Sequence, residues 1–127
     1  MSMQGWYGVD LDSTLAEYHG WDDGRIGAPI PLMVQRVKEW LAQGREVRIF
    51  TARVAEVGGY SSDSGRYALG DFAAEQRATI EAWCEQHLGQ KLQVTASKDF
   101  SMIELWDDRV VRVEANTGAV SRQHDKE

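Results

Sequence analysis

Short apolar segments rich in β-forming residues alternate along the chain with segments of helical periodicity. The first two apolar segments, residues 6–10 and 46–50, flank residues 32–43, where apolar side chains recur every three or four positions. Pro31 suits the first turn of that helix, and Gly44 suits its C-terminal end. Strands that alternate with helices favour right-handed crossovers and a mainly parallel sheet. The sequence therefore predicts an α/β fold.

The second half of the chain continues the alternation. We expect a helix over residues 71–88, and strands over residues 91–95, 101–106 and 110–114. Two irregular segments rich in glycine, residues 15–30 and 53–70, separate these elements, and loops of the second one's length are usually functional or mobile. With 127 residues, the chain is expected to be a single domain over residues 1–127 that ends in a polar tail, residues 122–127.

Charge and composition exclude several classes of protein. Fourteen Lys and Arg against twenty Asp and Glu give a net charge of −6, which disfavours binding to nucleic acid or anionic lipid through overall charge and leaves open a local basic site. The single cysteine, Cys84, excludes an internal disulfide and a zinc site built of cysteines. No apolar run reaches the roughly 18 residues of a membrane span, and the start of the sequence resembles no secretion signal. We expect a cytoplasmic protein.

Residues with chemically useful side chains follow the ends of the expected strands. They are Asp10 and Asp12 after the first strand, Thr51 after the second, Lys98 after the third, and Asp107 and Asp108 after the fourth. In parallel sheets, ligands bind beyond the carboxyl ends of the strands. Clustered carboxylates repel one another, and Mg²⁺, which prefers oxygen ligands, would remove that repulsion. Acids, a hydroxyl, a lysine and a metal together indicate a phosphoryl-transfer site.

In this order, the residues resemble the four motifs of the haloacid dehalogenase (HAD) superfamily. The motifs are Asp10-x-Asp12-x-Thr14, Thr51 at the end of an apolar strand, Lys98, and Asp107-Asp108, which together span residues 7–108. The stretches IFTAR at 49–53 and ELWDDR at 104–109 are also similar to those of small bacterial and phage HAD-like proteins. The resemblance implies a three-layer α/β/α Rossmann-like fold with a mainly parallel five-stranded sheet of order 3-2-1-4-5.

The resemblance also implies an open site and a reaction. Residues 13–50 and 52–97 each contain one expected helix, which leaves too little chain for a cap domain. The reaction would be Mg²⁺-dependent hydrolysis of a phosphomonoester. Asp10 would attack phosphorus and form an aspartyl-phosphate, and Asp12 would act first as general acid and then as general base. Thr51 would hydrogen-bond the transferring phosphoryl group, and Lys98 would neutralise its charge and that of Asp10.

Metal and substrate contacts follow from the same resemblance. The Mg²⁺ ligands would come from Asp10, the backbone carbonyl of Asp12, Asp107 and Asp108; spacing leaves open which of the last two binds directly. Substrate contacts would come from Ser13, Thr14, Ala52 and Arg53. Two arginines have other interpretations: Arg53 could pair with Glu56, and Arg109 could pair with an aspartate of the site.

Two loops are left to recognise the substrate, and the sequence does not identify that substrate. The sequence also leaves open whether the chain forms a homo-oligomer. The candidates are Tyr18, His19, Trp21 and Arg25 in residues 15–30, and Arg53, Tyr60, Arg66 and Tyr67 in residues 53–70. Aromatic and arginine side chains can stack on a base and bind an anion, so one alternative is a phosphatase of nucleotides or polynucleotide ends. A large phosphorylated partner would also suit an open site. Another alternative is a binding module that keeps the phosphate pocket with little turnover.

Overall fold

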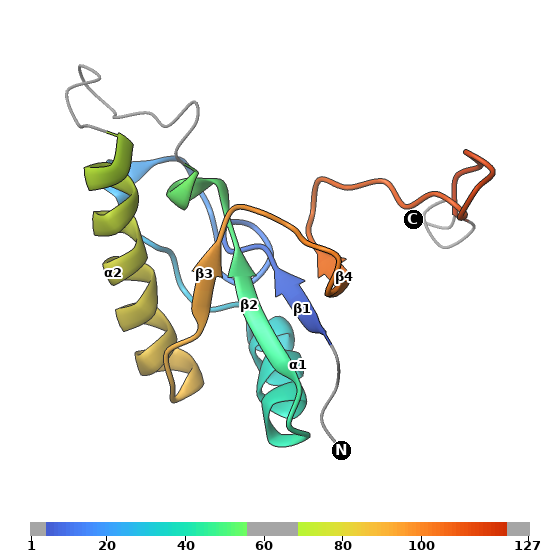
Figure 1. Ribbon diagram of the computed structural model, residues 1–127. Coiled ribbons are helices and arrows are strands. Elements are labelled where there is room, and N and C mark those ends of the chain that lie inside the picture. The colour runs from blue at the N-terminus through green and yellow to red at the C-terminus, as the bar shows by residue number, and fades with distance from the viewer. Residues whose placement is uncertain (1–4, 56–68, 122–127) are drawn as a thin grey trace.

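The structure, a computed structural model, describes residues 5–55 and 69–121 (Figure 1). Its strands and helices are, in chain order, β1 (Trp6–Val9), η1 (Asp22–Gly24), α1 (Pro31–Ala42), β2 (Glu46–Phe50), η2 (Ala52–Val54), α2 (Leu69–Leu88), β3 (Gln93–Thr95) and β4 (Met102–Trp106), where η marks a short 3₁₀ helix. Each strand and helix expected between residues 6 and 106 is present within two residues of its expected ends. The central part of the expected loop 53–70 and the tail 122–127 lie outside the described residues.

The four strands form one parallel sheet of order β3-β2-β1-β4. β1 pairs with β2 from Trp6↔Glu46 to Val9↔Ile49, and on its other side Val9 pairs with Trp106 of β4. The ends of β1, β2 and β4 therefore lie side by side at one edge of the sheet. The predicted α/β class with a parallel sheet is confirmed.

The predicted fifth strand at residues 110–114 is absent, so the sheet of five strands in the order 3-2-1-4-5 was wrong. After β4 the chain turns away from the sheet (Figure 1). Val110, Val111 and Val113 are about half exposed, and Val113 forms an isolated bridge with Val120 instead of pairing with β4. Valines favour strands because they pack on a half-buried sheet surface, and this segment has no such surface to cover.

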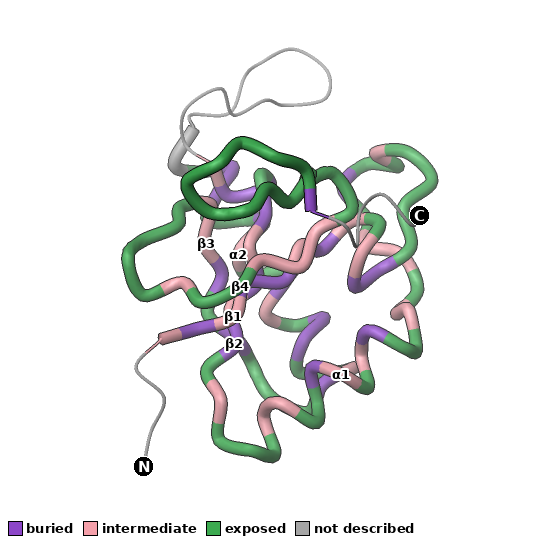
Figure 2. Tube along the Cα trace, turned by 90° about the vertical axis from the view of Figure 1, so that its right-hand side faces the viewer, coloured by how far each residue is buried: buried purple, intermediate pink, exposed green. Residues whose placement is uncertain are grey.

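Both helices pack on the same face of the sheet. Side chains from α1, α2 and alternate positions of the strands form one core, which includes Met33, Val37, Ile80, Cys84, Val9, Ile49 and Val94. Figure 2 shows α1 to one side of the sheet. On the other face, Arg48 lies 4.4 Å over the ring of Trp6. Residues 96–101 connect β3 to β4 and are too few for a helix, so the part of the chain described here has no third layer of helices. The expected three-layer arrangement was wrong in this respect.

The loop after β1 is well packed, although its glycines and prolines predicted an irregular segment. Leu15 and Ala16 are fully buried, and the backbone nitrogen of Glu17 donates to Ala28 at 2.8 Å. Gly27 is required at this contact, since a Cβ there would lie 2.1 Å from the carbonyl oxygen of Glu17. The folded loop carries Tyr18 to the carboxyl end of the sheet. Among the described residues, no helix is long and apolar enough to cross a membrane.

Candidate active site

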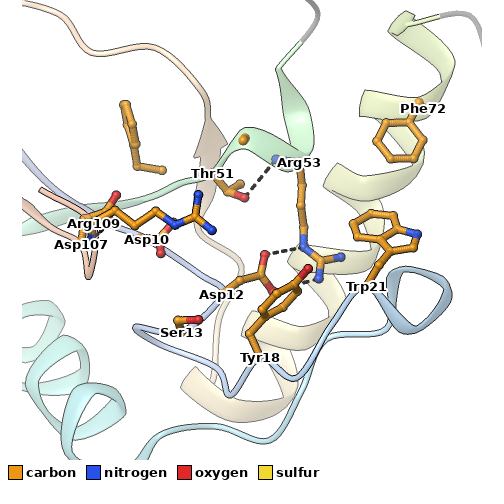
Figure 3. A pocket seen from close by; sticks show the side chains of 12 residues that line it. Asp10, Asp12, Ser13, Tyr18, Trp21, Thr51, Arg53, Phe72, Asp107 and Arg109 are labelled. Atoms are coloured by element: carbon orange, nitrogen blue, oxygen red, sulfur yellow. Dashed lines mark hydrogen bonds and ion pairs between the residues drawn. The ribbon is translucent and has the colours of Figure 1, made fainter. Parts of the chain in front are cut away.

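A cavity of about 430 Å³ opens at the carboxyl ends of β1, β2 and β4 (Figure 3). Seven of the residues predicted for the site line it: Asp10, Asp12, Ser13, Thr51, Ala52, Arg53 and Asp107. The other lining residues are Tyr18, Trp21, Phe50, Phe72 and Arg109. The cavity therefore brings most of the predicted site to one place.

Three carboxylates converge at the edge of this cavity. One oxygen each of Asp10, Asp107 and Asp108 lies within 4.8 Å of the others. The parallel pairing of β1 with β4 explains the approach, since Asp10 follows β1 and its backbone nitrogen donates to the carbonyl oxygen of Trp106 at 2.9 Å. The hydroxyl of Thr14 lies 3.3 Å from an oxygen of both Asp10 and Asp108, so it bridges the two strands.

The crowding changes the acidity of Asp10. Burial, the negative charge of Asp107 and the nearby carboxyl of Asp108 together raise its pKa from 3.8 to about 7, with burial the largest cause. A cation bound among the three carboxylates would oppose each of these effects. Carboxylate oxygens at this spacing are the ligands that Mg²⁺ prefers, so the residues present fit the expected metal.

A sharp turn after β1 separates the side chains of Asp10 and Asp12. The carbonyl of Leu11 accepts from the backbone nitrogens of Leu15 and Ala16, and Leu11 itself is fully buried in the core. In a continuous strand, two side chains at this spacing would point to the same face of the sheet. The turn instead directs the two carboxylates to different partners, although both residues line the cavity. The carboxylate of Asp12 is not part of the cluster of three.

Asp12 instead forms a paired contact with Arg53. Nε of Arg53 donates to Oδ2 of Asp12 at 2.8 Å, and Nη2 donates to Oδ1 at 2.9 Å. The other donors of this arginine bind the carbonyl of Gly24 at 2.7 Å and Oε1 of Gln76 at 2.9 Å. Its guanidinium also lies 4.9 Å over the ring of Trp21. Arg53 thus ties the turn after β1 to helix α2 and holds Asp12 in one orientation.

Thr51 lies at the end of β2 with its side chain toward the cavity. It is 3% exposed, and its backbone nitrogen donates to the carbonyl of Thr95 at 2.9 Å. Its hydroxyl oxygen accepts from the backbone nitrogen of Arg53 at 3.1 Å and caps η2. A hydroxyl that accepts one hydrogen bond can also donate one, and Thr51 lines the cavity.

Lys98 is the predicted site residue that the structure leaves apart from the others. It is exposed in the connection from β3 to β4, and it does not line the cavity. Arg109, which could have paired with an aspartate of the site, does line it. A cationic side chain therefore lines the cavity from the segment after β4, whereas the lysine that follows β3 does not.

Of the other residues predicted to contact the substrate, some line the cavity and others do not. Ser13 and Ala52 line the cavity, whereas Thr14 contacts Asp10 and Asp108. From the first loop, Tyr18 and Trp21 line the cavity, but His19 and Arg25 do not, and each contacts a neighbouring carboxylate on the surface. The candidates Glu56, Tyr60, Arg66 and Tyr67 lie outside the described residues.

Sequence reasoning missed Gln76, Phe50 and Phe72. Gln76 is 7% exposed and accepts from Arg53, although it lies on the apolar stripe of α2. A polar residue on such a stripe is a detectable signal, because a buried amide needs a hydrogen-bonding partner. Phe72 and Phe50 gave no such signal, since each fits the apolar pattern of its own element.

Comparison with known proteins supports the fold and no more. No protein-family model matches the chain, and no curated protein matches it. A solved structure described as a conserved protein coded by a locus from Bacteroides thetaiotaomicron is similar, with a TM-score of 0.50 and 20% sequence identity. The match covers 95% of this chain and 84% of that one. At this identity it shows a shared α/β fold and assigns no activity.

Proposed function

We propose that this chain is a Mg²⁺-dependent phosphomonoester hydrolase of the HAD type, without a cap domain, that acts through an aspartyl-phosphate on Asp10. The observation that carries the proposal is the meeting of Asp10 with Asp107 and Asp108 beside the hydroxyl of Thr51. These residues come from three strand ends, in the arrangement that the resemblance implies. A cluster of acids alone would need no hydroxyl donor beside it, whereas phosphoryl transfer does.

Asp10 is the group that attacks phosphorus. Its carboxylate forms a bond to phosphorus while the bond from phosphorus to the leaving oxygen breaks, and the hydroxyl of Thr51 donates to a phosphoryl oxygen. Attack requires the ionised carboxylate, and the pKa of about 7 in the metal-free protein works against ionisation. Bound Mg²⁺, held by Asp10, Asp107 and Asp108, would supply the positive charge that favours the ionised form.

Asp12 acts as the general acid and then as the general base. In the first step it gives a proton to the leaving oxygen, and in the second it takes one from the water that hydrolyses the aspartyl-phosphate. The two hydrogen bonds from Arg53 hold the carboxylate in the cavity wall. Each carboxylate oxygen has two acceptor sites, so a position remains on each for the proton that is transferred. Arg53 therefore acts as a positioning residue for Asp12.

The test is phosphate release from a panel of mononucleotides, sugar phosphates, phosphopeptides and oligonucleotide ends, with and without Mg²⁺. We expect Mg²⁺-dependent release by the native protein and none by Asp10→Asn. Asp23→Asn is the matched control, because Asp23 is exposed and does not line the cavity. Substantial Mg²⁺-dependent turnover by Asp10→Asn would contradict the proposal.

A second candidate function is the binding of a phosphate ligand with little turnover. Two observations favour it: both oxygens of Asp12 are engaged by Arg53, and Lys98 does not line the cavity. The presence of Asp12 argues against it, because a pure binder has no need of a general acid. Tight binding of phosphate ligands, combined with no release from any member of the panel, would support this function over hydrolysis.

A narrower version of the first proposal is that the substrate is a nucleotide or a polynucleotide end. Tyr18 and Trp21 line the same cavity as the three acids, and Tyr18 is 39% exposed there. A partly exposed ring beside a phosphate site can stack on a base. The net charge of −6 gives no long-range attraction for a nucleic acid, so the contact would be local to this cavity.

A further inference from the structure

The cavity is lined by two cationic side chains, Arg53 and Arg109. Both come from segments that follow strands, and both were ambiguous from the sequence. A phosphomonoester carries up to two negative charges, and it must enter a cavity that already holds several carboxylates. The way these two arginines are bound decides which of them can meet the substrate.

Arg53 has no donor left for a substrate. Its side chain is 3% exposed, and Nε and Nη2 donate to the two oxygens of Asp12. Nη1 donates to Gly24 and Gln76, and Nη2 also lies 3.4 Å from the carbonyl of Arg25. These contacts account for all five N–H groups of a guanidinium. A phosphate could bind Arg53 only by displacing contacts that hold the loop and α2 together.

The side chain of Arg109 is bound quite differently from that of Arg53. Its backbone nitrogen donates to Oδ1 of Asp107 at 2.8 Å, which fixes the turn that follows β4. Within residues 5–55 and 69–121, its guanidinium has no hydrogen bond or salt bridge. Figure 3 shows this side chain extending from the turn into the cavity, on the side of Asp10 and Thr51.

We propose that Arg109 binds the phosphate of the substrate through its guanidinium, in the part that the HAD resemblance assigns to Lys98. This inference rests on the proposed phosphate chemistry of the cavity. A guanidinium presents paired N–H donors that match two phosphate oxygens, whereas a lysine acts as a single point of charge. The turn held by Asp107 sets the position of Arg109 relative to the carboxylate cluster, so the same turn supplies an acid for the metal and a cation for the phosphate.

The test is calorimetric titration of inorganic phosphate into the protein in the presence of Mg²⁺. We expect Arg109→Gln to weaken phosphate binding by about 10- to 100-fold, the usual effect of losing hydrogen bonds to a charged group. Arg109→Lys should recover part of the loss. Lys98→Gln and the matched control Arg112→Gln, an exposed arginine on the same segment, should bind phosphate as the native protein does. Thermal melting shows whether each variant is folded.

Several outcomes would overturn the assignment. One is loss of binding in Lys98→Gln with normal binding in Arg109→Gln, and another is the absence of phosphate binding by the native protein. If phosphate binds through Arg109 but no phosphomonoester is hydrolysed, the inference stands and the hydrolase proposal fails. If hydrolysis is found, the two variants are also compared kinetically, and Arg109→Gln should raise KM more than Lys98→Gln does.

Discussion

Asp12 and Arg53 meet through two parallel hydrogen bonds, of 2.8 and 2.9 Å, although they are 41 positions apart in the sequence. The carboxylate is partly exposed in the cavity wall, and the guanidinium is almost fully buried. The pair connects the turn after β1 to the end of β2. Its loss should therefore affect both the stability of the fold and the chemistry of the cavity.

Arg53→Gln should destabilise the protein strongly. The substitution leaves Asp12 without its partner and removes the donors bound by Gly24 and Gln76. Breaking a buried ion pair by removing one partner typically costs about 3–5 kcal/mol. Denaturant unfolding measures this change. Arg25→Gln is the control, because Arg25 pairs with Asp22 on the surface and its loss should cost no more than about 0.5 kcal/mol. Equal effects of the two substitutions would show that the buried pair contributes little.

The metal-free protein should lose stability relative to Asp10→Asn as the pH rises from 4 to 7. The folded pKa of Asp10 is about 7, above its unfolded value of 3.8, so the unfolded chain releases its proton first. Folding stability falls with pH wherever the folded state binds more protons. Above pH 7 the difference should level off. Denaturant unfolding of the native protein and of Asp10→Asn, in chelator, measures it.

Mg²⁺ should reverse that dependence. A metal ion competes with the proton for the carboxylate of Asp10, so its stabilising effect should be larger at pH 8 than at pH 6. Melting temperatures at both pH values, with and without Mg²⁺, provide the comparison. Asp107→Asn should lower the Mg²⁺-dependent shift, whereas Asp23→Asn should leave it unchanged. A shift of equal size in all three proteins would place the metal elsewhere.

Tyr18→Ala should weaken the use of nucleotides as substrates more than that of other phosphomonoesters. Loss of a stacking ring typically costs about 1–3 kcal/mol, so KM for a nucleoside monophosphate should rise roughly 5- to 150-fold. KM for a sugar phosphate should change little. Phe100→Ala is the matched control, since Phe100 is a fully exposed aromatic residue that does not line the cavity. Equal changes for both substrates would exclude a base-stacking role for Tyr18.

Cys84 should be unreactive in the folded protein. Burial within α2 raises the pKa of its thiol to about 12, which leaves almost no thiolate at neutral pH. Alkylation by iodoacetamide should therefore follow global unfolding and become fast only in denaturant. Mass spectrometry over time measures the rate. Rapid modification of the native protein would show that the core between α2 and the sheet opens locally.

The sequence was most informative where local pattern and tertiary packing agree. The period of α1 and the apolar runs of β1 and β2 predicted these elements, because the same residues that favour them also fill the core. The placement of Asp10 and Thr51 followed in turn, since parallel strands bring their carboxyl ends together. The prediction of a fifth strand was wrong because local pattern and packing disagree there. The valines of residues 110–113 have strand propensity, but they have no surface to pack on.

The details of the site depended on contacts that no local pattern encodes. Arg53 was expected to meet the substrate or Glu56, and its contact with Asp12 requires the turn after β1, helix α2 and the folded loop together. The exclusion of Lys98 from the cavity depends on the path of residues 96–101. Spacing along the chain identifies which strand end carries a residue, but it does not set the direction of a long side chain.

The pairing of β1 with β4 also sets the time at which the site can form. Asp10 is synthesised well before Asp107 and Asp108, and the contact between them closes residues 11–106 into one loop. Closing so long a loop carries an entropic cost that shorter pairings avoid. The helices and the first three strands can therefore assemble while the carboxylate cluster is still incomplete. A nascent chain that stops before β4 would contain most of the core and Asp10, but neither Asp107 nor Asp108.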